Sequence, residues 1–190
     1  MVKRRDTVVG LNQILRRRGF RRYRSVWNRP ISGFVEVVDL SRAKSGDLVT
    51  MECGIFEPGL FHDVTGSAPP KIIIPEICAI RARVGELING RDKWWSEVDI
   101  DTQASIDCEQ IIFPFLERVR SYEAIAEYLQ QKDVINKRYP LPILYLSSAM
   151  ARLGDIPQAC CILDEISKKT SEAWRLQVVQ CAGRIGCLLQ

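Results

Sequence analysis

The chain has 190 residues and a mass of 21.7 kDa, which allows one domain, or one domain with a helical appendage, and excludes two large domains. Hydrophobic residues make up 46% and charged residues 26%, an ordinary globular composition that excludes a disordered, collagen-like or coiled-coil chain. The formal net charge is +4, but the first 29 residues hold ten basic residues and one acid, so they carry +9 and the remaining 161 carry −5.

The first predicted element is a short amphipathic helix, Thr7–Arg18, whose apolar residues recur at helical spacing. Asp6 or Thr7 can serve as its N-cap, and Gly19 is a natural residue to follow its last turn. Three arginines fill that last turn, where cations complement the helix dipole. The strongest positive charge of the chain is therefore expected on this helix and the segment that follows it.

After the helix the apolar pattern changes to period two, which predicts strands. Tyr23, Ser25 and Trp27 are expected on one face of the first strand, with arginines on the other. Short connections favour an antiparallel meander. The further strands are predicted at Phe34–Leu40, Leu48–Phe56 and Cys78–Leu87, with turns at Ser32-Gly33 and Asn89-Gly90 and an irregular loop from Phe61 through Pro70.

The second half of the chain has helical periodicity. Pro114 predicts a kink or break in the first of these helices, and Ser121 can cap the second. Gly154-Asp155 predicts the turn between the third and fourth helices. The expected helices are Thr102–Val119, Tyr122–Gln131, Pro140–Leu153, Ile156–Lys168 and a last one from Ser171 to about Leu189.

The predicted fold class is α+β: an N-terminal helix, an antiparallel sheet of about four strands, and a C-terminal helical half with an α-hairpin. A polar stretch ending at Asp133, followed by two closely spaced prolines, predicts an α+β domain at 1–132 and a helical appendage at 133–190. The turn around Gly154 resembles that of a tetratricopeptide-type repeat. Only about one repeat is visible, so a generic α-hairpin is the favoured interpretation.

The cysteines are odd in number and contain no C-x-x-C pair, unlike a typical secreted disulfide scaffold. Most lie in apolar runs, where free cysteine behaves as a small hydrophobe. His62 is the only histidine, and no cysteine pair has zinc-finger spacing. We therefore predict no bound metal and seven free thiols, at Cys53, Cys78, Cys108, Cys160, Cys161, Cys181 and Cys187.

The location of the protein is predicted from what the sequence does not contain. No run approaches the 18 apolar residues of a membrane span, and the charged segment Met1–Asp6 is not followed by the apolar region of a secretory signal. We therefore expect a cytoplasmic protein with no membrane partner.

The sequence contains few of the residue patterns that are typical of catalytic or cofactor sites. The sequence has no P-loop, no dinucleotide fingerprint and no H-E-x-x-H, and no cofactor is expected. His62-Asp63 is the only pair of a histidine with a neighbouring acid, and a general base needs a positioned partner rather than a sequence neighbour. Asp99 and Asp101 could offer two carboxylates on one side of a strand, but acidic loop residues are common. An enzyme is the minority interpretation.

Four spaced elements form a recognisable order in the first two thirds of the chain. They are Leu15…Gly19-Phe20…Tyr23…Trp27, Gly54-Ile55-Phe56-x-Pro58, Cys78-x-x-Arg81-x-Arg83-x-Gly85-x-Leu87 and Asp92-x-Trp94-Trp95. In these elements the chain resembles a bacterial family catalogued as a domain of unknown function, number 4304. The resemblance runs from about Asp6 to Leu129. It implies an α+β domain and supplies no activity.

The chain departs from that family at a few polar positions. Members tend to show Asn-x-Gln-x-Ser after the second strand, where this chain has Asp39-Leu40-Ser41-Arg42-Ala43. Glu52 stands in the third strand where Asn is frequent in the family. A function carried by those positions would be altered in this member.

Three functional hypotheses follow. The first is a protein-binding module, for example an immunity or antitoxin-like protein, that meets an acidic protein surface through its charge. The second is nucleic-acid binding through the arginine-rich helix and hairpin, and the third is an enzyme of unknown class. A merely solvated or intramolecular basic face remains open, and the sequence does not predict an oligomeric state. The candidate binding residues are Arg16, Arg17, Arg18, Arg22, Arg24, Arg81, Arg83, Trp94 and Trp95.

Overall fold

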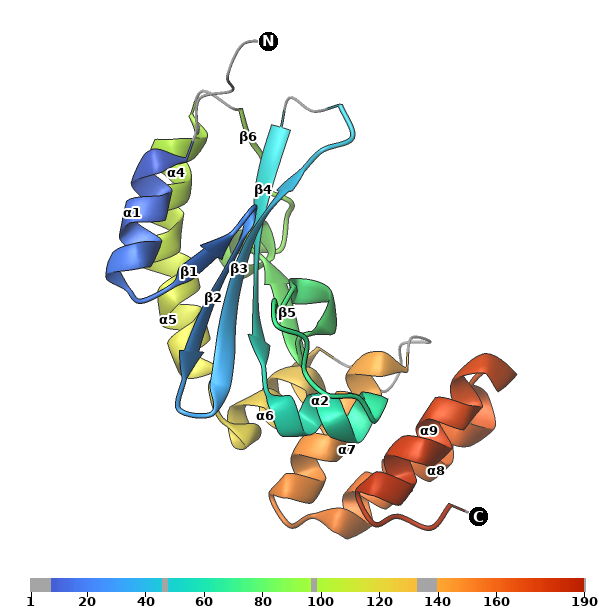
Figure 1. The fold of residues 1–190 in the computed structure, drawn as a ribbon. Coiled ribbons are helices and arrows are strands. Elements are labelled where there is room, and N and C mark those ends of the chain that lie inside the picture. Colours follow the sequence, from blue (N-terminus) through green and yellow to red (C-terminus); the bar gives the residue numbers. More distant parts are fainter. Residues whose placement is uncertain (1–7, 46–47, 97–98, 133–139, 190) are drawn as a thin grey trace. The chain divides into compact units, whose positions relative to one another are not determined.

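The computed structural model describes residues 8–45, 48–96, 99–132 and 140–189 (Figure 1). The chain forms two compact units, the first from described residues within 1–55 and 72–118 and the second from those within 56–71 and 119–190. Residues 56–71 and 122–131 thus belong with the C-terminal helices. The independent folding of 1–132, with a join at 133, stays a prediction.

Unit 1 is built on an antiparallel sheet in the order β1-β2-β3-β4-β5, with β6 also paired to β4. The α+β fold class and the antiparallel sheet are confirmed, although the sheet has six strands rather than about four. The strands are β1 (Arg21–Tyr23), β2 (Val26–Ile31), β3 (Phe34–Arg42), β4 (Leu48–Phe56), β5 (Ile80–Arg83) and β6 (Trp95–Ser96).

The first predicted strand is in fact a hairpin. β1 and β2 pair as Tyr23 with Val26, and the two residues between them form the turn, with Arg24 at φ 60°. A two-residue turn preserves the period-two alternation, so the sequence pattern alone does not reveal it. The predicted turn at Ser32-Gly33 is confirmed, with both residues at positive φ.

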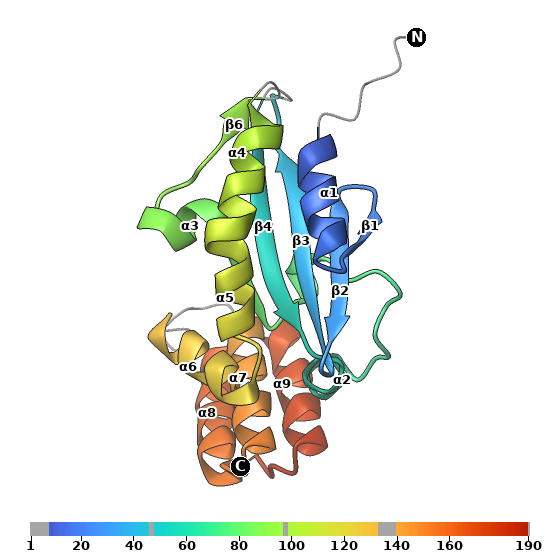
Figure 2. The same ribbon diagram turned by 90° about the vertical axis from the view of Figure 1, so that its left-hand side faces the viewer.

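Helices of unit 1 cover one face of this sheet, as Figures 1 and 2 show. Leu11, Leu15 and Cys108 from these helices are fully buried, as are Trp27 and Cys53 from the strands. The helices and helical turns of unit 1 are α1 (Val9–Arg17), η1 (Pro75–Ile77), α3 (Val84–Asn89), α4 (Ile100–Asp107), η2 (Cys108–Ile112) and α5 (Phe113–Arg118), of which α1, α4 and α5 lie on the sheet.

The N-terminus of α1 is not capped as predicted. Asp6 and Thr7 lie outside the described residues, and the N-cap residue is Val8, which makes no side-chain cap bond. Instead the carboxylate of Asp101, in α4, accepts the backbone N–H of Gly10 at 2.9 Å and of Leu11 at 2.8 Å. A negative charge at a helix N-terminus stabilises the helix, so Asp101 joins α4 to α1.

Two predictions of strand are wrong, the first of them only in part. The predicted strand Cys78–Leu87 ends at Arg83, where Glu86 caps the start of α3, and the chain turns away at Gly90. Asp99 and Asp101 lie at the start of α4 and not on a strand, so they do not form a paired-carboxylate site. The Glu86 cap accounts for the start of α3, whereas Asp99 makes no side-chain cap bond at the start of α4. In both places the strand periodicity covers too few residues to exclude a helix.

The long helix predicted at Thr102–Val119 is broken as Pro114 suggested. α4 passes into a π-helical turn, η2, before α5 begins at Phe113. Proline cannot donate a backbone hydrogen bond to the preceding turn, and a wider turn accommodates that missing donor.

Unit 2 is an assembly of helices around α7, whose residues 143–150 are all buried. The loop predicted from Phe61 through Pro70 is helical as far as Thr65 and irregular after it. The helix begins earlier because Glu57 accepts the N–H of Leu60 and Pro58 stands at the first helical position. No helix in the described part of the chain is long and apolar enough to cross a membrane. The helices of unit 2 are α2 (Pro58–Thr65), α6 (Tyr122–Gln131), α7 (Leu141–Arg152), α8 (Ile156–Lys169) and α9 (Glu172–Arg184).

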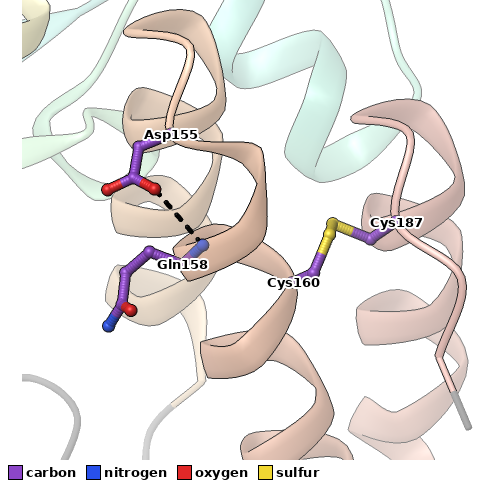
Figure 3. Close-up of a disulfide and its surroundings, with 4 residues drawn as sticks. All are labelled: Asp155, Gln158, Cys160 and Cys187. Carbon is purple, nitrogen blue, oxygen red and sulfur yellow. Dashed lines mark hydrogen bonds between the residues drawn. A yellow bond between two sulfur atoms is a disulfide. The ribbon is translucent and has the colours of Figure 1, made fainter.

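The prediction of seven free thiols is wrong for one pair. Cys160, in α8, and Cys187, just after α9, form a disulfide (Figure 3). The two residues are 27 positions apart, and only the packing of α8 beside the segment that follows α9 brings them together. Five cysteines remain free, and four of these are buried, while Cys161 is exposed.

Candidate functional site

Three of the N-terminal arginines lie over aromatic rings of unit 1. The guanidinium carbon of Arg18 is 5.0 Å from the ring centre of Phe113, and that of Arg22 is 5.0 Å from Trp27. Arg29 stacks on Phe20 at 4.8 Å and forms an ion pair with buried Glu36. Cation–π contacts of this kind stabilise the fold, so this part of the positive charge is used within unit 1.

Four other arginines remain exposed, and because they lie within nine residues of the chain we call them the basic surface: Arg16, Arg17, Arg21 and Arg24. Arg21 is paired with Asn28 and so lies on the sheet face away from α1, at the edge strand β1. Arg16 and Arg17 lie in the last turn of α1, and the others on β1 and its turn. Among the residues that the structure describes, none of these four side chains has a hydrogen-bonded or ionic partner. Their charge is therefore available to a ligand. Arg18 and Arg22, predicted with them, have partners in unit 1: each lies over a ring, and Arg18, itself half exposed, is also 3.7 Å from Glu117.

Arg81 and Arg83 form a separate cluster with Glu52, on the sheet face opposite α1 and α4. Glu52 is only 1% exposed, and its Oε2 accepts Arg81 Nε at 2.8 Å while Oε1 accepts Arg83 Nε at 3.0 Å. Hydrogen bonding to Glu52 raises the pKa of Arg83. Both arginines are thus held by a buried carboxylate, and each is about 40% exposed at the surface. Arg83 also pairs with Asp92, and Arg81 lies 3.7 Å from Glu76.

Asp39 lies on the same face and is a half-buried carboxylate with a raised pKa. Burial raises the pKa of Asp39, and the nearby charges of Glu76 and Glu52 raise it further, while a hydrogen bond with Ser25 opposes them. Its Oδ1 is buried without a hydrogen-bond partner in the described residues, and Ser41 Oγ lies 3.4 Å from Oδ2. Asp39, Ser41 and Glu52, three polar positions at which the chain departs from the family pattern, therefore lie close together.

We expect Asp39→Asn to raise the free energy of unfolding at pH 7. The raised pKa means that the ionised carboxylate is disfavoured in the folded state, and this penalty is present above the folded pKa. The gain should shrink as the pH falls through that pKa, and vanish below the ordinary value of 3.8, where the aspartate is protonated in both states. Urea unfolding between pH 3.5 and 7.5 measures this difference.

Glu109→Gln is the control, because Glu109 is exposed. It removes one negative charge from unit 1 without removing a buried one, and should give no gain that depends on pH in this way. Loss of stability in Asp39→Asn at pH 7 would show that the Asp39 charge is stabilising and would contradict the account.

The two adjacent tryptophans have different environments. Trp95, on β6, is 4% exposed and lies under Lys93, whose Nζ is 5.6 Å from its ring centre. Lys93 also pairs with Asp107 at 2.5 Å. Trp94 is 36% exposed and could contact a ligand. Trp95 is therefore a core residue and Trp94 a surface residue. Among the described residues, no hydrogen bond joins either tryptophan to the basic surface or to Glu52.

The catalytic alternatives gain no support from the geometry. Exposed His62 lies on α2, and the side chain of its neighbour Asp63 binds Ser148 and Arg152 instead. In the described residues no three His, Cys, Asp or Glu side chains are grouped to hold a metal ion. Burial raises the pKa of the thiols of Cys53, Cys78, Cys108 and Cys181, which keeps them protonated and unreactive.

Sequence reasoning missed one polar cluster, in unit 2. Asp63 is 7% exposed, and its Oδ2 accepts Ser148 Oγ at 2.7 Å, Arg152 Nε at 3.0 Å and Arg152 Nη2 at 2.9 Å. The backbone oxygens of Asp63 and Val64 accept hydrogen bonds from Arg184. α2, α7 and α9 are joined here. No short sequence pattern could reveal contacts between residues 85 to 121 positions apart.

Comparison with known proteins identifies the family. The family model described as Domain of unknown function (DUF4304) matches residues 11–113, just over half of the chain. No curated protein and no solved structure matches the chain. The matched span contains Gly54, Arg81, Arg83 and Gly85, which carry the resemblance seen in the sequence. The chain belongs to the DUF4304 family.

Proposed function

We propose that this protein is a protein-binding module, whose basic surface docks on an acidic surface of a partner. One observation carries the proposal: four exposed arginines within nine residues of chain have no anionic partner among the described residues. Like charges concentrated in one segment raise the rate and specificity of association with an oppositely charged surface. An immunity or antitoxin-like role, in which the module blocks its partner, is the form we propose.

An acidic protein fits this surface better than a nucleic acid does. The charge is confined to a short segment, and the rest of the chain carries −5. A short acidic segment needs only these arginines, whereas a long phosphate backbone would extend beyond the segment, and the net charge of the rest of the chain is negative. Arg18, Arg22 and Arg29, which would extend the positive track, already contact rings of unit 1. Nucleic-acid binding is the alternative, favoured by the arginine density itself.

A direct comparison of polyanions separates the two. Fluorescent poly-L-glutamate of 20 residues represents the acidic protein surface, and single-stranded and duplex DNA and RNA of equal total charge represent nucleic acids. At 100 mM salt we expect the full-length protein to bind poly-glutamate at least several-fold more tightly than any nucleic acid. Tighter binding of a nucleic acid, with a steep loss of affinity as salt rises, would overturn the protein-binding proposal and support the alternative.

A further inference from the structure

The sheet of unit 1 has an open edge at β5. In the described sheet β5 pairs with β4 alone, with Arg83 opposite Glu52, Ala82 opposite Cys53 and Arg81 opposite Gly54. In an antiparallel ladder alternate residue pairs exchange both backbone hydrogen bonds. In the pairs between them, the N–H and C=O groups point away from the partner strand. The register of β5 therefore decides which of its backbone groups face outward.

A hydrogen bond at the end of β5 fixes that register. The N–H of Arg83 donates to Glu86 Oε2 at 3.2 Å, in the cap of α3, so it points away from β4. Arg83 and Glu52 are thus a pair without backbone exchange. Because the pairs alternate, Ala82 and Cys53 exchange hydrogen bonds and Arg81 does not. The N–H and C=O of Arg81 consequently face the open edge.

The space beside this edge is unfilled. Many proteins protect a sheet edge with charged side chains that extend across it. Here both guanidinium groups turn back over the sheet face, where Glu52 Oε2 lies 2.6 Å from Arg81 Nη2. A pocket of about 250 Å3 remains, lined by Arg81, Ala82, Arg83 and Glu86. The side chain of Ala82 is buried on the helix-covered face, so the backbone of β5 lines the pocket.

The charge around the pocket is negative. The residues that line it carry two positive charges and one negative, and three more carboxylates are paired with its arginines, so this cluster has a net charge of −2 with all groups ionised. Glu76 and Asp92 are each 53% exposed, so their charge reaches the solvent beside the edge. A cationic side chain would be attracted here and an acidic one repelled. The carboxylates are Glu52, Glu76, Glu86 and Asp92.

We propose that the edge of β5 binds an extended segment of a partner protein that carries lysine or arginine, added to the sheet as a further strand. Two backbone hydrogen bonds with Arg81 would fix its register, and the pocket would receive its side chains. This edge is separate from the basic surface and has the opposite charge preference. The inference therefore holds or fails independently of the proposed function.

The test is nuclear magnetic resonance of the 15N-labelled full chain with short peptides. The probe is an acetylated and amidated Thr-Lys-Val-Lys-Thr peptide. One comparison peptide has Glu in place of both Lys, and another has every backbone nitrogen methylated. We expect the lysine peptide to shift the amide resonance of Arg81 and to slow its hydrogen exchange. Both comparison peptides should need at least fivefold higher concentrations for the same shift.

Protein variants check the charge preference. Glu76→Gln combined with Asp92→Asn should weaken binding of the lysine peptide several-fold, because both carboxylates lie beside the edge. Glu165→Gln combined with Glu172→Gln removes two exposed acids from unit 2 and should leave binding unchanged. The inference is overturned if Arg81 is unaffected at millimolar peptide, if the methylated peptide binds equally well, or if the glutamate peptide binds as tightly as the lysine peptide.

Discussion

Replacing Gly85 by alanine is expected to lower the free energy of unfolding by about 3 kcal/mol or more. A Cβ at Gly85 would lie 2.0 Å from the backbone oxygen of Arg91 and 2.5 Å from the backbone nitrogen of Lys93. These are main-chain atoms, so relief requires the 91–93 segment to move and not only a side chain to rotate. Urea denaturation followed by tryptophan fluorescence measures the loss.

Gly183→Ala is the matched control. Gly183 lies in α9, and a Cβ there would meet nothing within 4 Å. Because alanine favours helix over glycine, we expect stability to rise by up to about 1 kcal/mol. If Gly85→Ala were as stable as the wild type, the close approach of the 91–93 segment would be wrong, and with it the structural reason for this glycine in the family motif.

Asp63→Ala should also be strongly destabilising, by about 2 to 4 kcal/mol. The substitution leaves the buried hydroxyl of Ser148 and the guanidinium of Arg152 without their shared acceptor. The value is at the lower end of that expected for a buried pair, because Arg152 is 39% exposed and water can solvate part of its charge. Thermal and urea unfolding, monitored by circular dichroism, measure it.

Glu165→Gln removes an acid from an exposed pair with Lys169 in the same unit, and should change stability by less than about 0.5 kcal/mol. An equally small effect for Asp63→Ala would show that the Asp63 cluster does not join α2 to α7. An equally large effect for both variants would show that general charge, and not the buried contact, determines the stability of unit 2.

The sequence predicted those elements whose signals are local. β4 and α6 have the predicted bounds, because a long alternating run and a serine cap each lie within about ten residues. The predictions failed where a side chain distant in sequence decides the outcome. Asp101 caps α1 from 90 residues away, and the disulfide partner of Cys160 lies 27 residues along the chain. Such contacts leave no pattern in a single sequence.

The candidate site was predicted in part. The arginines of α1 and β1 were predicted from their density, but density does not distinguish Arg16, which has no partner among the described residues, from Arg18, which lies over a ring and near Glu117. Arg81 and Arg83 were expected as binding residues, and the structure shows that they also hold a buried carboxylate. Glu52 was identified only as a departure from the family pattern, because no sequence pattern predicts that it lies between two arginines.

The central claim is that location, and not total charge, makes the basic surface bind an acidic partner. It is tested by the dissociation constant for 20-residue poly-L-glutamate between 25 and 200 mM salt, for two double variants. Arg16→Gln with Arg17→Gln removes two charges from the basic surface. Lys71→Gln with Arg91→Gln removes two exposed charges elsewhere.

We expect the first variant to bind at least tenfold more weakly than the wild type at 25 mM salt and to show a shallower salt dependence, since fewer ionic contacts are made. The second should remain within about twofold of the wild type, because its lost charges lie outside the basic surface. Equal weakening of both variants would show that net charge alone governs binding and would contradict the account, as would unchanged binding by the first.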